Sequence, residues 1–273
     1  MLSNKLRRRI RSQFSKRADS FERSANWITS KALLNLHKEL ILNHHKEPAA
    51  LDLCCGTGLV GAYIKDRVGN IIGLDLSPSM LAQARHRLTK VIKGNAEKLH
   101  LYYPVRSRTP QASALAPRRV TSNGVDLIIC RQSLHFLDLN KLAREMKRIL
   151  KPNGQVIISQ TVPFNKQDSS YLHRIHIAKQ PLLKNFVTEK DMVRLVENTG
   201  CTRIRKRTVL IRESITDWLK RSPELSLTTR QKVLQLYHQA PADYRKLHRL
   251  KIHNGKITEY WKWVIVSGIK GTA

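Results

Sequence analysis

Two residues with acid–base chemistry stand four positions apart in the middle of the chain, in the run Cys130-Arg-Gln-Ser-Leu-His135. They follow an apolar stretch that has the composition of a buried strand. Near neutral pH a histidine can accept a phenolic or enolic proton, and an arginine can bind the negative charge that develops on the oxygen. His135 and Arg131 are therefore predicted to contact the substrate or act in catalysis. The structural alternative is that His135 only caps or packs.

A second group of candidates surrounds the glycine turn Cys55-Gly56-Thr-Gly58, which follows an apolar run. Glycines at such a turn let the backbone approach a bound nucleotide closely. With Gly61 the turn reads GxGxxG, a pattern that is compatible with NAD as well. Asp52 separates the two cofactors, because its carboxylate would repel a pyrophosphate but attract the ammonium and sulfonium groups of S-adenosylmethionine. The sequence therefore favours S-adenosylmethionine.

Asp75 lies nineteen positions beyond Gly56, where a second predicted strand ends. Its two carboxylate oxygens could accept hydrogen bonds from both hydroxyls of a ribose. Leu76 and Met80 follow at the start of a helix and could cover the two faces of an adenine, although Met80 could also be a core residue. These three side chains are predicted to complete the cofactor site.

The elements that must position these residues alternate between strands and helices from about residue 49 onward. Strands are predicted at 49–53, 70–75, 91–93, 125–130 and 155–160, with helices at 58–67, 79–88 and 139–150. This alternation predicts a Rossmann-like α/β fold with a seven-stranded, mostly parallel sheet and helices on both faces. Two later runs, 202–212 and 259–269, are predicted to pair antiparallel at one sheet edge. Ligands of such sheets bind at the carboxyl ends of the strands.

The rest of the chain is predicted to form additions to a catalytic domain that spans 46–273. Residues 1–45 are predicted to be a basic helical arm, because the first 18 residues contain seven Lys or Arg, no acid, and apolar residues every four positions. A lid, a mitochondrial presequence and a surface helix for an anionic partner all fit this arm, and a lid is favoured. Residues 100–124 are predicted to be a flexible basic loop. A helical insertion is predicted at 213–250, with helices around 215–220 and 228–238.

Four runs of the sequence resemble successive motifs of class I S-adenosylmethionine-dependent methyltransferases. Within that family they look most similar to the ubiquinone and menaquinone biosynthesis group. They are 51–58, 73–81, 94–99 and 150–155, in the family's order. The resemblance implies that Asn95, where many relatives have Asp, lies beside the adenine amino group and the Ala96 backbone at the ring edge. Cys55 stands where a similar cysteine is common, and Cys130 is counted with the cofactor site. The spacing of Arg131 and His135 looks like that of quinone-type and coumarin C-methyltransferases.

Three functions are compatible with these motifs. The leading hypothesis is methyl transfer from S-adenosylmethionine to carbon or oxygen of a small aromatic or quinone-like acceptor, an in-line displacement that needs no metal. The second is carboxyl O-methylation of an acyl chain on an acidic carrier protein, because 13–21 and 74–85 look similar to the malonyl-carrier methyltransferases. The third is a protein that binds S-adenosylmethionine without turnover and faces RNA or a complex. The motifs for methylating exocyclic base amines or cytosine C5 are absent after the fourth strand.

Composition adds expectations about partners and compartment. The chain has 50 Lys and Arg against 20 Asp and Glu, a formal charge of +30. This predicts attraction to an acidic carrier protein, a membrane surface or RNA, although dispersed charge is equally compatible with a basic proteome. Four cysteines without a CxxC pattern indicate a reducing compartment and no structural metal. No apolar run is long enough to cross a bilayer. A cytoplasmic location is expected, with the mitochondrial matrix as the alternative.

Overall fold

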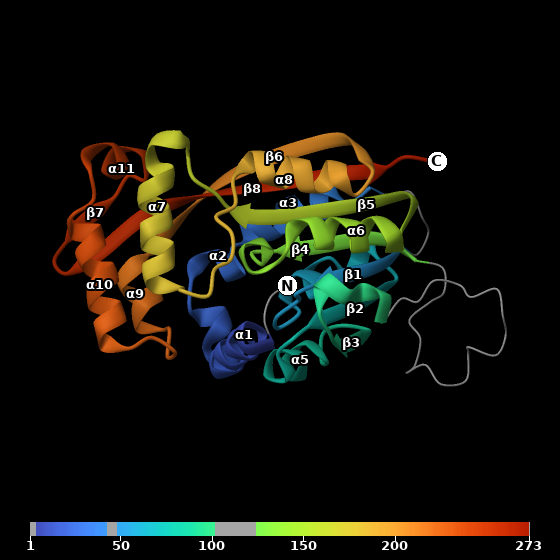
Figure 1. The fold of residues 1–273 in the computed structure, drawn as a ribbon, viewed down its shortest axis with the longest axis horizontal. Coiled ribbons are helices and arrows are strands. Elements are labelled where there is room, and N and C mark those ends of the chain that lie inside the picture. Colours follow the sequence, from blue (N-terminus) through green and yellow to red (C-terminus); the bar gives the residue numbers. More distant parts are fainter. Residues whose placement is uncertain (1–3, 43–47, 102–123, 273) are drawn as a thin grey trace.

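The computed structural model describes residues 4–42, 48–101 and 124–272 (Figure 1). At its centre is an eight-stranded sheet in which seven strands follow the order β3-β2-β1-β4-β5-β8-β6, while β7 pairs with β8 beside this path. The strands are β1 (Ala49–Leu53), β2 (Asn70–Asp75), β3 (Lys90–Lys93), β4 (Val125–Arg131), β5 (Leu150–Thr161), β6 (Cys201–Ser214), β7 (Lys251–His253) and β8 (Lys256–Lys270).

The strand directions confirm the predicted α/β fold class. Strands β3, β2, β1, β4 and β5 are parallel, and β8 runs antiparallel to both β5 and β6. The two late runs pair as predicted, with β6 outermost and β8 between β6 and β5. The short strand β7, which the sequence did not predict, adds a hairpin with β8.

Helices cover the sheet, and a further group of helices lies at one end of it (Figure 1). They are α1 (Asn4–Arg17), α2 (Asn26–Thr29), α3 (Lys31–Leu40), α4 (Leu59–Tyr63), α5 (Pro78–Ala84), α6 (Leu139–Ile149), α7 (Lys166–Lys179), α8 (Glu189–Asn198), α9 (Ile215–Lys220), α10 (Leu227–His238) and α11 (Ala242–Leu247). The crossover helix predicted at 58–67 is shorter, because Ile64 leaves helical geometry and a 3₁₀ turn follows. The helix predicted at 139–150 ends at Ile149, and β5 begins directly after it at Leu150.

Side chains of the central strands alternate between two apolar layers, as expected for a sheet covered on both faces. Ile129 and Ile157 pack with α3 and α4, whereas the neighbouring Ile128 and Ile158 pack with α6 and α8. The sheet is therefore held rigidly between helices, and this fixes the positions of the loops at the carboxyl ends of its strands.

The predicted insertion contains α9 and α10 where helices were predicted, and α11 in addition. Helix α7, which the sequence did not predict, packs against α10 and α11. Figure 1 shows this helical group at the end of β6 and β8 that lies away from β3. Buried Glu259 of β8 joins it to the sheet by accepting hydrogen bonds from Tyr237 and Tyr244 at 2.7 and 2.9 Å.

Some sequence predictions fall outside the described residues. These are most of the predicted basic loop, at 102–123, and the predicted boundary near residue 45, which falls within 43–47. Within the described part of the N-terminal arm, Trp27 and Leu33 are buried in the same core as the sheet. Among the helices that the structure describes, none is long and apolar enough to cross a membrane.

Candidate functional site

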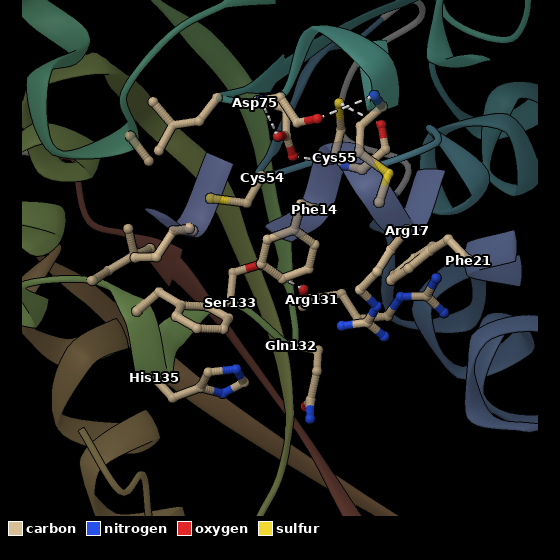
Figure 2. Close-up of a pocket in the computed structure, with 18 of the residues that line it drawn as sticks. Phe14, Arg17, Phe21, Cys54, Cys55, Asp75, Arg131, Gln132, Ser133 and His135 are labelled. Atoms are coloured by element: carbon tan, nitrogen blue, oxygen red, sulfur yellow. Dashed lines mark hydrogen bonds between the residues drawn. The ribbon is translucent and has the colours of Figure 1, made fainter. Parts of the chain in front are cut away.

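A pocket opens at the carboxyl ends of β1, β2 and β4, beneath α1 (Figure 2). Ten of the twelve predicted site residues line it: Asp52, Cys55, Gly56, Asp75, Leu76, Met80, Asn95, Ala96, Arg131 and His135. The structure places Gly58 and Cys130 outside its lining. Within the described ranges, no cluster of three or more His, Cys, Asp or Glu side chains could hold a metal ion.

The Asp75 carboxylate is held in place by the turn beside it. One oxygen accepts a hydrogen bond from the backbone N–H of Gly56 at 3.0 Å, and the other accepts from Ser77 at 2.9 Å. Burial raises the pKa of Asp75, while these N–H groups act against that rise. Because each carboxylate oxygen has a second acceptor position, Asp75 can still accept one ribose hydroxyl on each oxygen. The geometry fits the predicted cofactor role.

Asp52 lies deeper, below the glycine turn. Its side chain is 3% exposed and accepts a hydrogen bond from the Gly61 N–H at 3.3 Å. Burial raises the pKa of Asp52 to about 7, although the positive charge of Arg131 and the Gly61 N–H oppose this. A cation bound in the pocket would favour the ionised carboxylate. Asp52 is therefore suited to an ammonium or sulfonium group and unsuited to a phosphate.

Gly58 and Cys130 have structural positions instead. Gly58 has φ +78° at the start of α4, and a Cβ there would lie 3.1 Å from the Ala84 Cβ, so the glycine lets α4 approach α5 closely. Cys130 is fully buried in the layer facing α6, because alternation along β4 puts it on the face opposite to Ile129 and Arg131. Cys54, which was not predicted, lines the pocket.

Asn95, which is predicted to lie beside the adenine, contains an unpaired buried donor. Asn95 Oδ1 accepts a hydrogen bond from the Glu97 N–H at 2.9 Å, whereas its Nδ2 has no hydrogen-bond partner in the described part of the chain. An unpaired buried amide is costly, and a ligand with a ring nitrogen would satisfy it. Asn95 is predicted to lie beside the adenine amino group, but in this orientation its free group is a donor, which suits a ring nitrogen better than an amine. Met80 is buried, and it lines the pocket beside Leu76.

The rest of the pocket lining, called the acceptor wall below, is aromatic and cationic, and most of it was not predicted. Its residues come from five separate parts of the chain: Ile10, Phe14, Arg17, Phe21, Trp27, Phe136, His176, Lys179, Trp218 and Trp261. Phe14 of α1 meets Phe136 edge to face, with ring centroids 5.5 Å apart. Figure 2 shows the Phe14 ring within the pocket, between the Asp75 side and the His135 side. The four-residue spacing of Ile10 and Phe14 was the sequence signal for this wall.

Arg131 and His135 both reach the pocket, from the end of β4 and the turn after it. Arg131 donates a hydrogen bond to the Ile28 carbonyl at 3.0 Å and lies over the Trp27 ring. Burial lowers the pKa of Arg131 to about 10, so it remains a cation at neutral pH.

His135 is neutral at the same pH. Its Nδ1 is hydrogen-bonded to Gln160 Nε2 at 2.6 Å. Burial lowers the pKa of His135 to about 3, and the charges of His176 and Lys179 act in the same direction. A general base works best with a pKa near the working pH. This environment therefore favours a neutral hydrogen-bonding role for His135 over proton abstraction.

Comparison with known proteins gives consistent matches. Residues 51–158 match the family model described as a methyltransferase domain. The curated relatives include a demethylmenaquinone methyltransferase of Listeria monocytogenes, 26% identical over 164 residues, which cover 56% of this chain and 62% of that protein. Another, from Shouchella clausii, is 30% identical over 127 residues, covering 44% and 49%. The chain thus spans less than two thirds of the length of these relatives.

Solved structures share the fold at low sequence identity. The YcgJ protein of Bacillus subtilis has a TM-score of 0.70 at 17% identity, covering 88% of this chain and 98% of that one. Geranyl diphosphate C-methyltransferase from Streptomyces coelicolor, solved with S-adenosylhomocysteine, has a TM-score of 0.52 at 14% identity, covering 88% and 80%. At these identities the solved structures show that the chain shares their fold.

Proposed function

We propose that the chain is a class I S-adenosylmethionine-dependent methyltransferase that transfers a methyl group to carbon or oxygen of a small aromatic or quinone-like acceptor, because residues 51–158 match a methyltransferase domain. The observation that carries this proposal is the division of the pocket into two walls. Carboxylates and backbone donors form the wall at the strand ends, and aromatic side chains form the wall under α1. The demethylmenaquinone methyltransferases among the relatives support an acceptor of this class.

On the cofactor wall, each group has a distinct binding task. Asp75 would bind the ribose hydroxyls and Asn95 Nδ2 an adenine ring nitrogen. Asp52 would attract the ammonium group. Bound there, S-adenosylmethionine would supply an electrophilic methyl group on a sulfonium, and the protein's main task is to hold the acceptor in line with it. We assign no covalent role to any side chain.

On the acceptor wall, aromatic side chains would hold a flat ring and α1 would exclude water. Phe14 and Trp27 offer ring edges and faces to an aromatic acceptor. Arg131, as a buried cation, would stabilise negative charge on an acceptor oxygen, and neutral His135 would orient that oxygen by a hydrogen bond. An acceptor that is already ionised as a phenolate or enolate needs no base from the protein.

The test combines calorimetry with a transfer assay. The folded protein should bind S-adenosylmethionine and transfer its labelled methyl group to a demethylated naphthoquinol, with the methyl recovered on carbon or oxygen by mass spectrometry. Asp66→Asn, which removes an exposed carboxylate away from the pocket, should bind S-adenosylmethionine and transfer the methyl group as the unmodified protein does. A folded protein that binds no S-adenosylmethionine would contradict the proposal, as would one that binds it but methylates no phenol or quinol.

The exposed face of α1 favours a second candidate, carboxyl methylation of an acyl chain on an acidic carrier. Lys5, Arg8, Arg9 and Lys16 are exposed on this helix, whose described part contains no acid. The activity of the protein on a carrier-bound acyl substrate should then fall steeply as salt is added. Arg8→Gln with Arg9→Gln should reproduce that loss at low salt without changing activity on free acceptors. If methylation of a carrier-bound substrate is unchanged by salt and by the double substitution, this candidate is refuted.

A further inference from the structure

Besides Arg131, two further cations on the acceptor wall are buried. Arg17 ends α1 and Lys179 ends α7, and they are only 7% and 5% exposed. Both line the pocket. Figure 2 shows the Arg17 guanidinium beside Phe21, on the same side of the pocket as Arg131. Burying a charged side chain is costly unless it is paired, so their counter-charges must be identified.

One carboxylate stands near both cations. Glu224 Oε1 lies 3.5 Å from Arg17 Nε and 3.9 Å from Lys179 Nζ, which are distances of charge attraction rather than of good hydrogen bonds. Arg17 Nε and both Glu224 oxygens have no hydrogen-bond partner among residues 4–42, 48–101 and 124–272. The cluster therefore contains two positive charges and one negative charge, a surplus of one buried positive charge.

Aromatic rings form the remaining surroundings of these cations. Lys179 Nζ lies 4.2 Å from the centre of the Trp218 ring, and the Arg17 guanidinium lies about 5.5 Å from both Phe14 and Phe21. Such contacts stabilise a cation partly but supply no negative charge. Burial lowers the pKa of Lys179 to about 7, the charge of Arg17 lowers it further, and Glu224 opposes the change. The free pocket thus holds Lys179 close to losing its proton.

The cofactor wall does not offer the missing charge. Its carboxylates, Asp52 and Asp75, are at the strand ends, and Asp52 has Arg131 as its cationic neighbour. A ligand with one negative charge would balance the surplus at Arg17 and Lys179. A carboxylate carries that single charge and has two oxygens for two donors, whereas a phosphate dianion would reverse the balance.

We propose that the methyl acceptor is an aromatic carboxylic acid whose carboxylate is bound by Arg17 and Lys179, with its ring against Phe14 and Trp218. This inference rests on the proposed function, because it names the acceptor class of the same pocket. Hydrogen bonds to charged groups predict that the acid binds roughly 10- to 100-fold more tightly than an uncharged analogue.

The experiment compares two ligands that differ only at the carboxylate. Full-length protein saturated with S-adenosylhomocysteine is titrated with 1-hydroxy-2-naphthoate and with 1-hydroxy-2-naphthamide at pH 8, in two buffers of different ionisation enthalpy. The acid should bind at least about tenfold more tightly and should take up protons on binding, because the carboxylate restores the charge of Lys179. Lys179→Met should abolish both the preference and the proton uptake while leaving the affinity for S-adenosylmethionine unchanged.

Two further variants make the result independent of folding defects at one site. Glu224→Gln removes the competing carboxylate and should tighten binding of the acid but not of the amide. Lys232→Met, at an exposed position of α10, should behave as wild type. Equal binding of acid and amide would overturn the proposal, and so would a loss of S-adenosylmethionine affinity in Lys179→Met, since the pair would then serve the cofactor.

The proposed function can fail separately from this inference. If acid and amide are bound and methylated equally well, the methyltransferase proposal stands and the carboxylate site is refuted. If neither ligand binds or accepts a methyl group while S-adenosylmethionine binds, the aromatic acceptor class is refuted together with the carboxylate site.

Discussion

The two walls of the pocket are built in different ways. The cofactor wall is made of short runs of consecutive residues at the ends of neighbouring parallel strands, and its charged side chains include the carboxylates Asp52 and Asp75. The acceptor wall is assembled from α1, α2, the turn after β4, α7, α9 and β8, and its charged side chains include the cations Arg17 and Lys179. One wall is local and acidic, and the other is long-range and basic. This difference predicts that substitutions on each wall affect one ligand and spare the other.

The largest effect is expected at Asp75. Asp75→Asn replaces one carboxylate oxygen by an amide donor that must face a ribose hydroxyl, or the N–H of Gly56 or Ser77. The loss of charge-assisted hydrogen bonds predicts roughly 100-fold weaker binding of S-adenosylmethionine. Calorimetry on the free protein measures this directly. A loss of less than about threefold would mean that Asp75 serves the turn and not the ribose.

A smaller effect is expected at Phe14, on the other wall. The Phe14 ring projects from α1 into the pocket and contacts Phe136. Phe14→Ala removes this ring. Loss of one aromatic contact with the acceptor predicts about a tenfold rise in its KM, and the affinity for S-adenosylmethionine should not change. Leu227→Ala, at a side chain that is 75% exposed, is the control. If cofactor affinity fell instead, the walls would not be independent.

The same difference explains how much of the molecule could be predicted from the sequence. Gly56 and Asp75 were recognisable because strand, turn and strand end are adjacent in the chain, and the alternation of elements fixed the sheet class. Trp218 and Lys179 carry no local signal, since they reach the pocket only when the helical insertion and α7 fold back over the strand ends. Cys130 was assigned to the site because the sequence shows that it lies near the end of a strand but does not show on which face of the sheet its side chain lies.

A still smaller effect is expected at His135, on the acceptor wall. Its pKa of about 3 means that the ring stays neutral and does not titrate between pH 5 and 8. His135→Gln should therefore reduce kcat only several-fold, roughly the loss of one hydrogen bond, and leave the shape of the pH–rate profile unchanged. A loss of 100-fold or more, with disappearance of one limb of the profile, would show that His135 is the base after all.

The last effects are on the stability of the free protein, and they should have opposite pH dependence on the two walls. The folded-state pKa of Asp52 is raised from 3.8 to about 7, so its ionisation disfavours the folded state as pH rises through that range. The folded-state pKa of Lys179 is lowered from 10.5 to about 7, so its protonation disfavours the folded state as pH falls through that range.

Neutral replacements should therefore stabilise the free protein at opposite ends of the pH range. Asp52→Asn should raise Tm by on the order of 5 °C at pH 9 and little at pH 4, whereas Lys179→Met should raise it at pH 6 and little at pH 10. Thermal unfolding of the ligand-free protein across pH measures both. Because each replacement should also weaken binding of its own ligand, both charges would be retained at the expense of stability. If both variants followed the same pH trend, the two walls would not differ in the sign of their buried charge.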